Sequence, residues 1–267
     1  MANVLIKIEY DGSQFCGWQK QPAARTVQGE IEHVLEFIAG EPVHIHGTSR
    51  TDAGVHALGQ CASFEWTNNM PIEKLPEVMN RRLGVGGTGR QGAEGDIKII
   101  SAEEKPADFH ARYDCKGKTY QYVIDKSTDI FKRNYGYQFP EAADLDIEKM
   151  REAAEHIIGT HDFKCFEAAG GTMRETTVRT ISALDINDQS EHNSLSGHNP
   201  NAAGIIISVT GDGFLYNMVR IIVGTLIEVG LGKRDPASVA QAIESCDRAN
   251  AGFTAPPQGL YLKEIYF

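Results

Sequence analysis

The stretch GTSRTDAGVHALGQ (Gly47–Gln60) decides the fold and function that we expect for this chain. Two β-rich segments flank it, EPVHIH (Glu41–His46) before and QCASFEW (Gln60–Trp66) after. The small and polar residues between them predict a tight loop held by two strands. Asp52 lies at its centre, and a carboxylate on a rigid, exposed loop is suited to chemistry. The alternative is a structural turn in which Asp52 only binds nearby backbone N–H groups.

The composition indicates a globular protein of one large or two moderate domains. The 267 residues are 41% hydrophobic, which is enough for a sizeable core. No apolar run approaches twenty residues and the start does not resemble a signal peptide, so we expect a cytoplasmic protein without a membrane span. The five cysteines are scattered and show no C-x-x-C spacing, which favours free thiols over a zinc site.

The charge distribution leaves a nucleic-acid enzyme possible. A net charge of −10 argues against a protein that coats nucleic acid, but binding depends on the local field. Lys105–Arg133 holds seven Lys or Arg and five aromatic residues. That mixture is typical of surfaces that contact phosphates and stack bases, and Arg112 and Lys118 are our candidates for phosphate contacts. The alternative is a solvated strand pair with an ordinary charge mixture.

Hydrophobic periodicity predicts an α+β fold, with helices covering one face of a mostly antiparallel sheet. Strands are expected at 4–10, 41–46, 60–66, 96–100, 118–124, 177–186, 204–209 and 260–267, and helices at 27–39, 72–82, 147–158, 214–229 and 236–246. The element order begins again after Lys105. We therefore expect two similar subdomains, 1–105 with the catalytic loop and 106–267, with an active-site cleft between them.

Three other motifs receive structural interpretations. GVGGTG (Gly84–Gly89) fits G-x-G-x-x-G but lacks a strand before it and a helix after it, so we expect a surface loop. The polar segment Asp188–Ala203 also predicts a loop. His44 and His46 could ligate a metal, but no third ligand lies near, and two strand histidines are the favoured interpretation. We expect His56 to support the loop rather than act as a general base.

Arg220 stands in a segment that is apolar nearly all round, FLYNMVRIIVGTLIEVG (Phe214–Gly230). Such a helix is buried. A guanidinium there needs a partner, and Asp52 is a candidate that Arg220 would keep ionised. Alternatively, Arg220 extends to solvent or pairs with another acid.

Seven ordered blocks across nearly the whole chain resemble the tRNA pseudouridine synthase A family. The blocks are IEYDGSQFCGWQKQ (Ile8–Gln21), TVQGEIE (Thr26–Glu32), RTDAGVHALGQ (Arg50–Gln60), DFHARYDCKGKTYQY (Asp108–Tyr122), GTHDFKCF (Gly159–Phe166), GFLYNMVRIIVGTLIEVG (Gly213–Gly230) and APPQGLYLKEI (Ala255–Ile265). The segments 84–95 and 188–203 lie outside these blocks and depart from the family pattern.

The resemblance implies an enzyme that isomerises uridine to pseudouridine at positions 38 to 40 of the tRNA anticodon stem-loop. It implies a homodimer of two α/β subdomains around a central antiparallel sheet, with no metal and no cofactor. The family's nucleophile falls on Asp52, and its active-site tyrosine, which would stack on the flipped uracil, falls on Tyr120. Arg220 matches the arginine of the buried helix, and Arg50 would fill the gap left by the flipped base.

Two other functions compete with this one. A non-catalytic RNA-binding module would have no need of Asp52, Tyr120 and Arg220 together. A glycoside hydrolase would need a second carboxylate placed as an acid, and no such residue stands out in the matching blocks.

Overall fold

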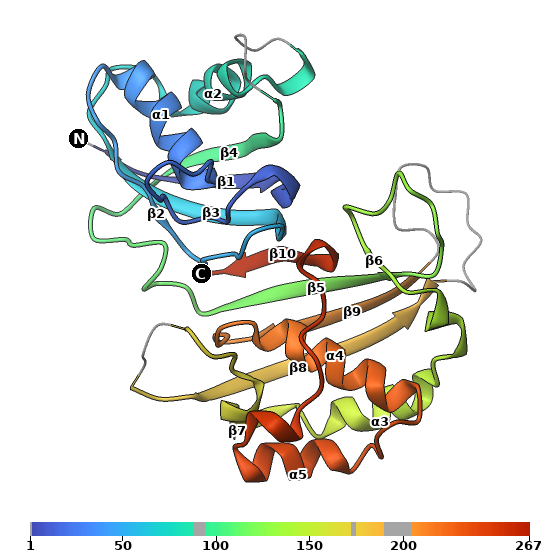
Figure 1. Cartoon of the computed structure of the whole chain (residues 1–267). Helices are drawn as coiled ribbons and strands as arrows, with labels where there is room; N and C mark the ends of the chain where they lie inside the picture. Colours follow the sequence, from blue (N-terminus) through green and yellow to red (C-terminus); the bar gives the residue numbers. More distant parts are fainter. Residues whose placement is uncertain (1, 88–93, 172–174, 190–203) are drawn as a thin grey trace. The chain divides into compact units, whose positions relative to one another are not determined.

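The computed structural model describes residues 2–87, 94–171, 175–189 and 204–267. The chain divides into two compact units, Met1–Lys116 with Tyr261–Phe267, and Gly117–Leu260. The described residues contain ten strands and five α-helices, which confirms the predicted α+β fold (Figure 1). Which residues form separate domains, and where the cleft lies, stay predictions.

The first unit is a mostly antiparallel sheet with helices α1 and α2 on one side (Figure 1). Its strand order is β4-β1-β3-β10, with β2 added to β3. β1 pairs antiparallel with β3 and β4, whereas β10 runs parallel to β3. The elements are β1 (Ala2–Tyr10), α1 (Val27–Ala39), β2 (His46–Gly47), β3 (His56–Trp66), α2 (Leu75–Leu83), β4 (Ile97–Lys105) and β10 (Leu260–Tyr266).

Helix α1 forms where its capping residues and apolar spacing predict it. The Thr26 side chain accepts a hydrogen bond from Gly29 N at 3.3 Å, and Gly40 ends the helix with φ of 79°. Val27, Ile31 and Leu35 are fully buried, so one face of α1 belongs to the core of the unit.

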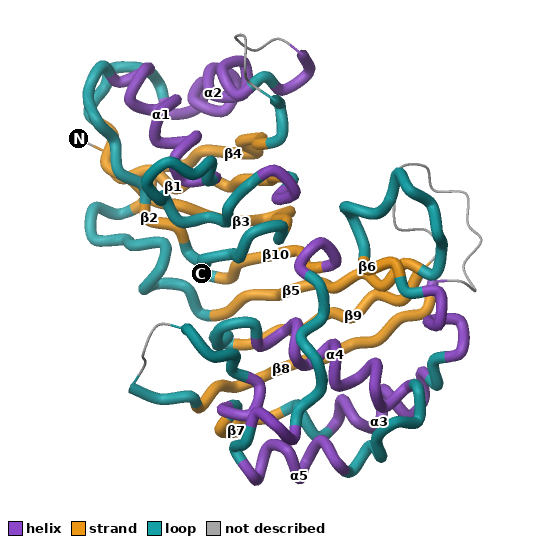
Figure 2. The backbone as a smooth tube through the Cα atoms, viewed as in Figure 1, coloured by secondary structure: helices purple, strands orange, loops and turns teal. Residues whose placement is uncertain are grey.

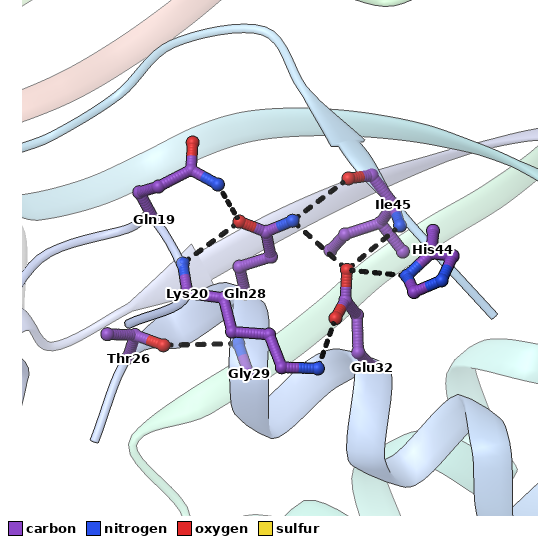
Figure 3. Close-up of polar contacts among 8 residues, drawn as sticks. All are labelled: Gln19, Lys20, Thr26, Gln28, Gly29, Glu32, His44 and Ile45. Carbon is purple, nitrogen blue, oxygen red and sulfur yellow. Dashed lines mark hydrogen bonds and ion pairs between the residues drawn. The ribbon is translucent and has the colours of Figure 1, made fainter. Parts of the chain in front are cut away.

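The strand predicted at 41–46 is wrong, because only His46 and Gly47 pair, with Ser63 and Ala62 of β3. The backbone of Ile45 is bonded to side chains of α1 instead. Its N–H donates to Glu32 Oε1 at 3.3 Å, and its carbonyl accepts from Gln28 Nε2 at 3.2 Å (Figure 3). Two helix side chains therefore replace the neighbouring strand that the β-rich sequence predicted.

The second unit has the strand order β5-β9-β8-β7, all antiparallel, with β6 parallel to β5 (Figure 2). Helix α3 contacts both β8 and α4, and α5 contacts β7. The elements are β5 (Gly117–Asp125), β6 (Tyr137–Gln138), α3 (Ile147–Glu155), β7 (Gly159–Asp162), β8 (Val178–Asp188), β9 (Gly204–Gly211), α4 (Met218–Gly230) and α5 (Ser238–Ser245).

The remaining predictions differ from the structure mainly at the ends of elements. Helix α4 begins at Met218 rather than Phe214, because Asn217 adopts the left-handed conformation with φ of 59°. Residues 85–87 of the predicted surface loop form a 3-10 turn, and 88–93 lie outside the described residues. Most of the loop predicted at 188–203 lies outside them too. In the part of the chain that the structure describes, no helix is long and apolar enough to cross a membrane.

The segment 251–255 crosses α4 at closely packed small residues. A Cβ at Gly224 would lie 1.9 Å from the carbonyl oxygen of Phe253, and one at Gly252 would lie 2.6 Å from Thr225 Cα. Thr225 Oγ1 accepts a hydrogen bond from Gly252 N at 2.8 Å. The sequence FLYNMVRIIVGTLIEVG therefore needs its central glycine for a backbone contact and not for flexibility.

We expect Gly224→Ala to lower the free energy of unfolding by about 1–3 kcal/mol, although alanine is normally the better helix former by about 1 kcal/mol. The added methyl group meets a backbone carbonyl, which cannot rotate away. Urea denaturation measures the change. Gly29→Ala in α1 is the control, because its only contact under 3.0 Å is the Thr26 hydroxyl. Equal effects of the two substitutions would contradict the close approach.

Candidate active site

The Asp52 loop connects β2 to β3, and buried hydrogen bonds to β3 fix the residues that precede Asp52. Thr48 donates to the Cys61 carbonyl from both its N–H, at 2.9 Å, and its hydroxyl, at 3.1 Å. The Gln60 side chain donates from Nε2 to the Ser49 carbonyl at 2.7 Å and accepts from Ser49 N at 3.3 Å. Just before Arg50, the N–H and the carbonyl of Ser49 are therefore both hydrogen-bonded.

The N-terminal segment after β1 braces the other side of the loop. Trp18 N donates to the Thr51 carbonyl at 3.0 Å, and the buried hydroxyl groups of Tyr10 and Thr51 lie 2.7 Å apart. Gly17 has φ of +91°, and a Cβ there would lie 2.8 Å from the Thr51 carbonyl. A Cβ at Gly12 would lie 2.0 Å from the carbonyl of Val55. Glycine is needed at both positions for backbone to pack on backbone.

Asp52 itself is half-buried, between exposed Arg50 and exposed Ala53. The turn at this point is made by its main-chain carbonyl, which accepts from Val55 N at 3.2 Å, with Gly54 at φ of 79°. This main-chain bond closes the turn and does not require the carboxylate, so the role of the Asp52 side chain stays a prediction. An acid side chain held on a fixed backbone and reached by solvent is suited to a reaction.

His56 supports the loop from beneath. It is 2% exposed, and its ring stacks on Tyr261 with centroids 4.7 Å apart. Its Nδ1 accepts a hydrogen bond from Gly12 N at 3.1 Å. Nδ1 also lies 3.2 Å from Asp11 Oδ1, which accepts from Ser13 N. This setting agrees with the supporting role expected for His56.

A buried carboxylate on α1 holds the segment that leads into β2 (Figure 3). Glu32 is 5% exposed and accepts from Lys20 Nζ at 2.9 Å, from Gln28 Nε2 at 3.0 Å and from Ile45 N at 3.3 Å. His44 Nδ1 lies 3.8 Å away. The hydrogen bond to Glu32 raises the pKa of the Lys20 ammonium. This cluster was not predicted, and an acid on the apolar face of a predicted helix is the signal that could have found it.

Tyr120 and Arg220 belong to the second unit. Tyr120 lies on β5, is 6% exposed, and packs edge-on against Phe214 with ring centroids 5.1 Å apart. Arg220 is half-buried on α4 and donates from Nε to the Ala255 carbonyl at 2.6 Å and from Nη1 to Asn217 Oδ1 at 2.7 Å. Two nitrogens of Arg220 are therefore hydrogen-bonded within the unit, and the pairing of Arg220 with Asp52 stays a prediction.

The other candidate groups differ in how far they are exposed. Arg112 is exposed and Lys118 is half-buried on β5. Burial raises the pKa of the Cys61 and Cys165 thiols to about 12, so both remain protonated at neutral pH and are poor nucleophiles. Among the described residues, no group of three or more His, Cys, Asp or Glu is arranged to hold a metal ion.

A family model described as tRNA pseudouridine synthase matches residues 6–114 and 153–267 of the chain. The chain belongs to this family. The match includes the braced Asp52 loop and helix α4, and family membership makes the chain an enzyme, an isomerase.

Full-length relatives support the assignment. tRNA pseudouridine synthase A 2 of Clostridium tetani is 44% identical over 270 residues, covering 99% of this chain and 98% of the relative. tRNA pseudouridine synthase A 2 of Clostridium perfringens and tRNA pseudouridine synthase A of Caldicellulosiruptor bescii are each 42% identical over 269 residues, and each alignment covers both chains completely. These alignments also cover residues 115–152, which the family model does not match.

We expect Glu32→Ala to lower the free energy of unfolding by about 1–3 kcal/mol, because it leaves the buried N–H group of Ile45 without its acceptor and removes one acceptor of the half-buried Gln28 amide. Urea denaturation measures this value. Glu36→Ala, one turn further along the same helix and exposed, should change it by no more than about 0.5 kcal/mol. A Glu32→Ala variant as stable as the control would show that the cluster does not hold the segment.

Proposed function

We propose that this protein isomerises uridine to pseudouridine at positions 38 to 40 of the tRNA anticodon stem-loop, with Asp52 as the nucleophile. The observation that carries the proposal is the braced Asp52 loop within the part of the chain that matches the tRNA pseudouridine synthase family. Substrate and product have the same atoms. The reaction therefore needs no oxidant or reductant, and we propose that it proceeds without a metal or an organic cofactor.

The chemistry explains why the nucleotide must leave the helix. The uracil separates from C1′, rotates and rejoins the ribose through C5, while the C5 proton is lost and N1 gains one. A base cannot turn within a stacked helix, and flipping it out costs a few kcal/mol. In the proposed site Tyr120 stacks on the flipped base, which offsets about 1–3 kcal/mol, and Arg50 fills the vacated position.

Asp52 would divide one difficult step into two easier ones by forming a covalent intermediate. Its carboxylate would attack C6 of the uracil, attack C1′ of the ribose, or assist a glycal route. A base flipped toward an exposed loop can reach the carboxylate without moving the braced backbone. We further propose that the enzyme acts in the cytoplasm as a homodimer, with Arg112 and Lys118 contacting phosphates.

Asp52→Asn should fold and bind tRNA like the wild type, but lose at least about a thousandfold in single-turnover rate, since the amide is not a nucleophile. Mapping pseudouridine in unmodified tRNA after incubation measures the rate. Asp185→Asn, an exposed aspartate on β8, is the control and should keep full activity. Activity of Asp52→Asn within tenfold of wild type would refute the nucleophile assignment.

Arg220→Leu should lose nearly all activity, and Arg220→Lys should be intermediate because it keeps the charge but not the planar fork. If Arg220 holds Asp52 ionised, its loss raises the pKa of that carboxyl, so residual activity should shift to higher pH. Single-turnover rates measured across pH test both expectations. The control is Arg248→Leu, since Arg248 also donates to the segment 251–255, at 3.3 Å to the Ala251 carbonyl. An equal loss in both variants, or an unshifted pH profile, would end the proposed pairing.

A further inference from the structure

Three aromatic rings form a row at the surface of the first unit, and the proposed reaction uses none of them. The centroids of His46 and His110 lie 4.8 Å apart, and those of His110 and Tyr113 lie 4.4 Å apart. The planes of neighbouring rings are tilted by 35° and 38°. Tyr113 ends the row and is 78% exposed, so a large aromatic surface faces solvent.

A network of short-range hydrogen bonds fixes the turn that carries His110 and Tyr113. His110 N donates to Asp114 Oδ2 at 2.7 Å, and the N–H groups of Tyr113 and Asp114 both donate to the His110 carbonyl at 3.0 Å. Arg112 N donates to His110 Nδ1 at 3.1 Å. Because Nδ1 accepts, the His110 ring is neutral in this geometry. Burial and the neighbouring His46 also hold its pKa below the usual value.

The turn is anchored to the sheet. Ala111 is fully buried, and its N–H donates to Ser63 Oγ on β3 at 3.0 Å. Ser63 is also the register partner of His46 in the β2–β3 pair. Strand β3 therefore positions the backbone of His46 and the turn that carries His110 and Tyr113, so binding would not have to order this backbone first.

The chemistry of the row suits an unpaired nucleobase. Neutral aromatic rings stack on any base, and an adjacent cation contacts the backbone phosphate. Arg112, between His110 and Tyr113 in sequence, is exposed. Tyr120 is only 6% exposed, so Tyr113 presents far more ring surface to an RNA. His46 and Asp52 are six positions apart in the chain, so their Cα atoms lie within about 22 Å of each other, near enough for two nucleotides of one stem-loop.

We propose that His46, His110 and Tyr113 form a stacking platform for an unpaired tRNA base other than the target uridine, with Arg112 on the adjacent phosphate. The platform rests on the proposed function, because it assumes an RNA substrate. It deepens that function by assigning recognition of a second nucleotide to the first unit.

Fluorescence anisotropy with a labelled anticodon stem-loop RNA at fixed salt tests the platform. Tyr113→Ala and Tyr113→Leu should weaken binding by about 5- to 160-fold, the range for loss of one stacked base. Tyr113→Phe should bind within twofold of wild type, because stacking does not need the hydroxyl. Phe37→Ala is the matched control, since Phe37 is 57% exposed in the same unit with the Arg82 guanidinium 3.4 Å from its ring, and its affinity should not change.

A second arm identifies the base. We use a series of stem-loops in which one loop nucleotide at a time is made abasic. The RNA that lacks the stacked base should bind the wild type more weakly than the intact RNA does, and its affinity should not fall further with Tyr113→Ala. Affinity of Tyr113→Ala equal to wild type would overturn the platform. A Tyr113→Ala variant that keeps its RNA affinity but changes its oligomeric state, as measured by sedimentation, would also overturn the platform. That result would assign this face to a second copy of the chain.

The same experiment separates the platform from the proposed reaction. Binding that depends on Tyr113, together with no pseudouridine formed by the wild type, would refute the reaction and retain the platform. Pseudouridine formation with binding independent of Tyr113 would retain the reaction and overturn the platform. No binding of the stem-loop by the wild type would overturn both.

Discussion

The Asp52 loop depends on close backbone packing between it and the segment after β1. A reactive carboxylate at a surface turn is useful only if the turn does not move, and a turn rich in Gly, Ala and Ser has little side-chain packing to hold it. This chain supplies the rigidity through the backbone. Gly12 and Gly17 let one chain segment touch another, and Trp18 and Gln60 hold the loop's polar groups from opposite sides. Much of the motif around Asp52 therefore serves its position rather than its reactivity.

Close backbone packing at glycine residues also positions Arg220. Gly224 and Gly252 allow the segment 251–255 to lie directly on α4, and that crossing brings the Ala255 carbonyl to within 2.6 Å of Arg220 Nε. Asn217, in a left-handed conformation at the start of the helix, supplies the acceptor for Nη1. Two neutral acceptors therefore orient Nε and Nη1 of the guanidinium.

The sequence predicts those elements whose formation depends on residues close together in the chain. The cap and apolar stripe of α1, the buried helix α4 and the turn at Asp52 each depend on residues within a few positions, and each is confirmed. The strand predicted at 41–46 was wrong because its backbone partners are Glu32 and Gln28, side chains of an earlier helix. The Arg220 acceptor lies 35 residues away and is a carbonyl, which no sequence pattern marks. The ring row joins β2 to a turn much later in the chain and was invisible for the same reason.

The acidic net charge does not oppose RNA binding, because salt screens exposed charges beyond about 8 Å at physiological ionic strength. RNA binding depends instead on the electrostatic field at the surface that contacts the RNA. Within Lys105–Arg133 the cations are not equivalent, since Lys105 pairs with Glu103 at 2.9 Å and Lys126 with Asp188 at 2.7 Å. Those two charges are largely compensated before any phosphate arrives, so a simple count of basic residues overstates the local field. Arg112 differs in kind, because it is exposed and lies in sequence between His110 and Tyr113, where the proposed platform would let stacking and charge act on the same nucleotide.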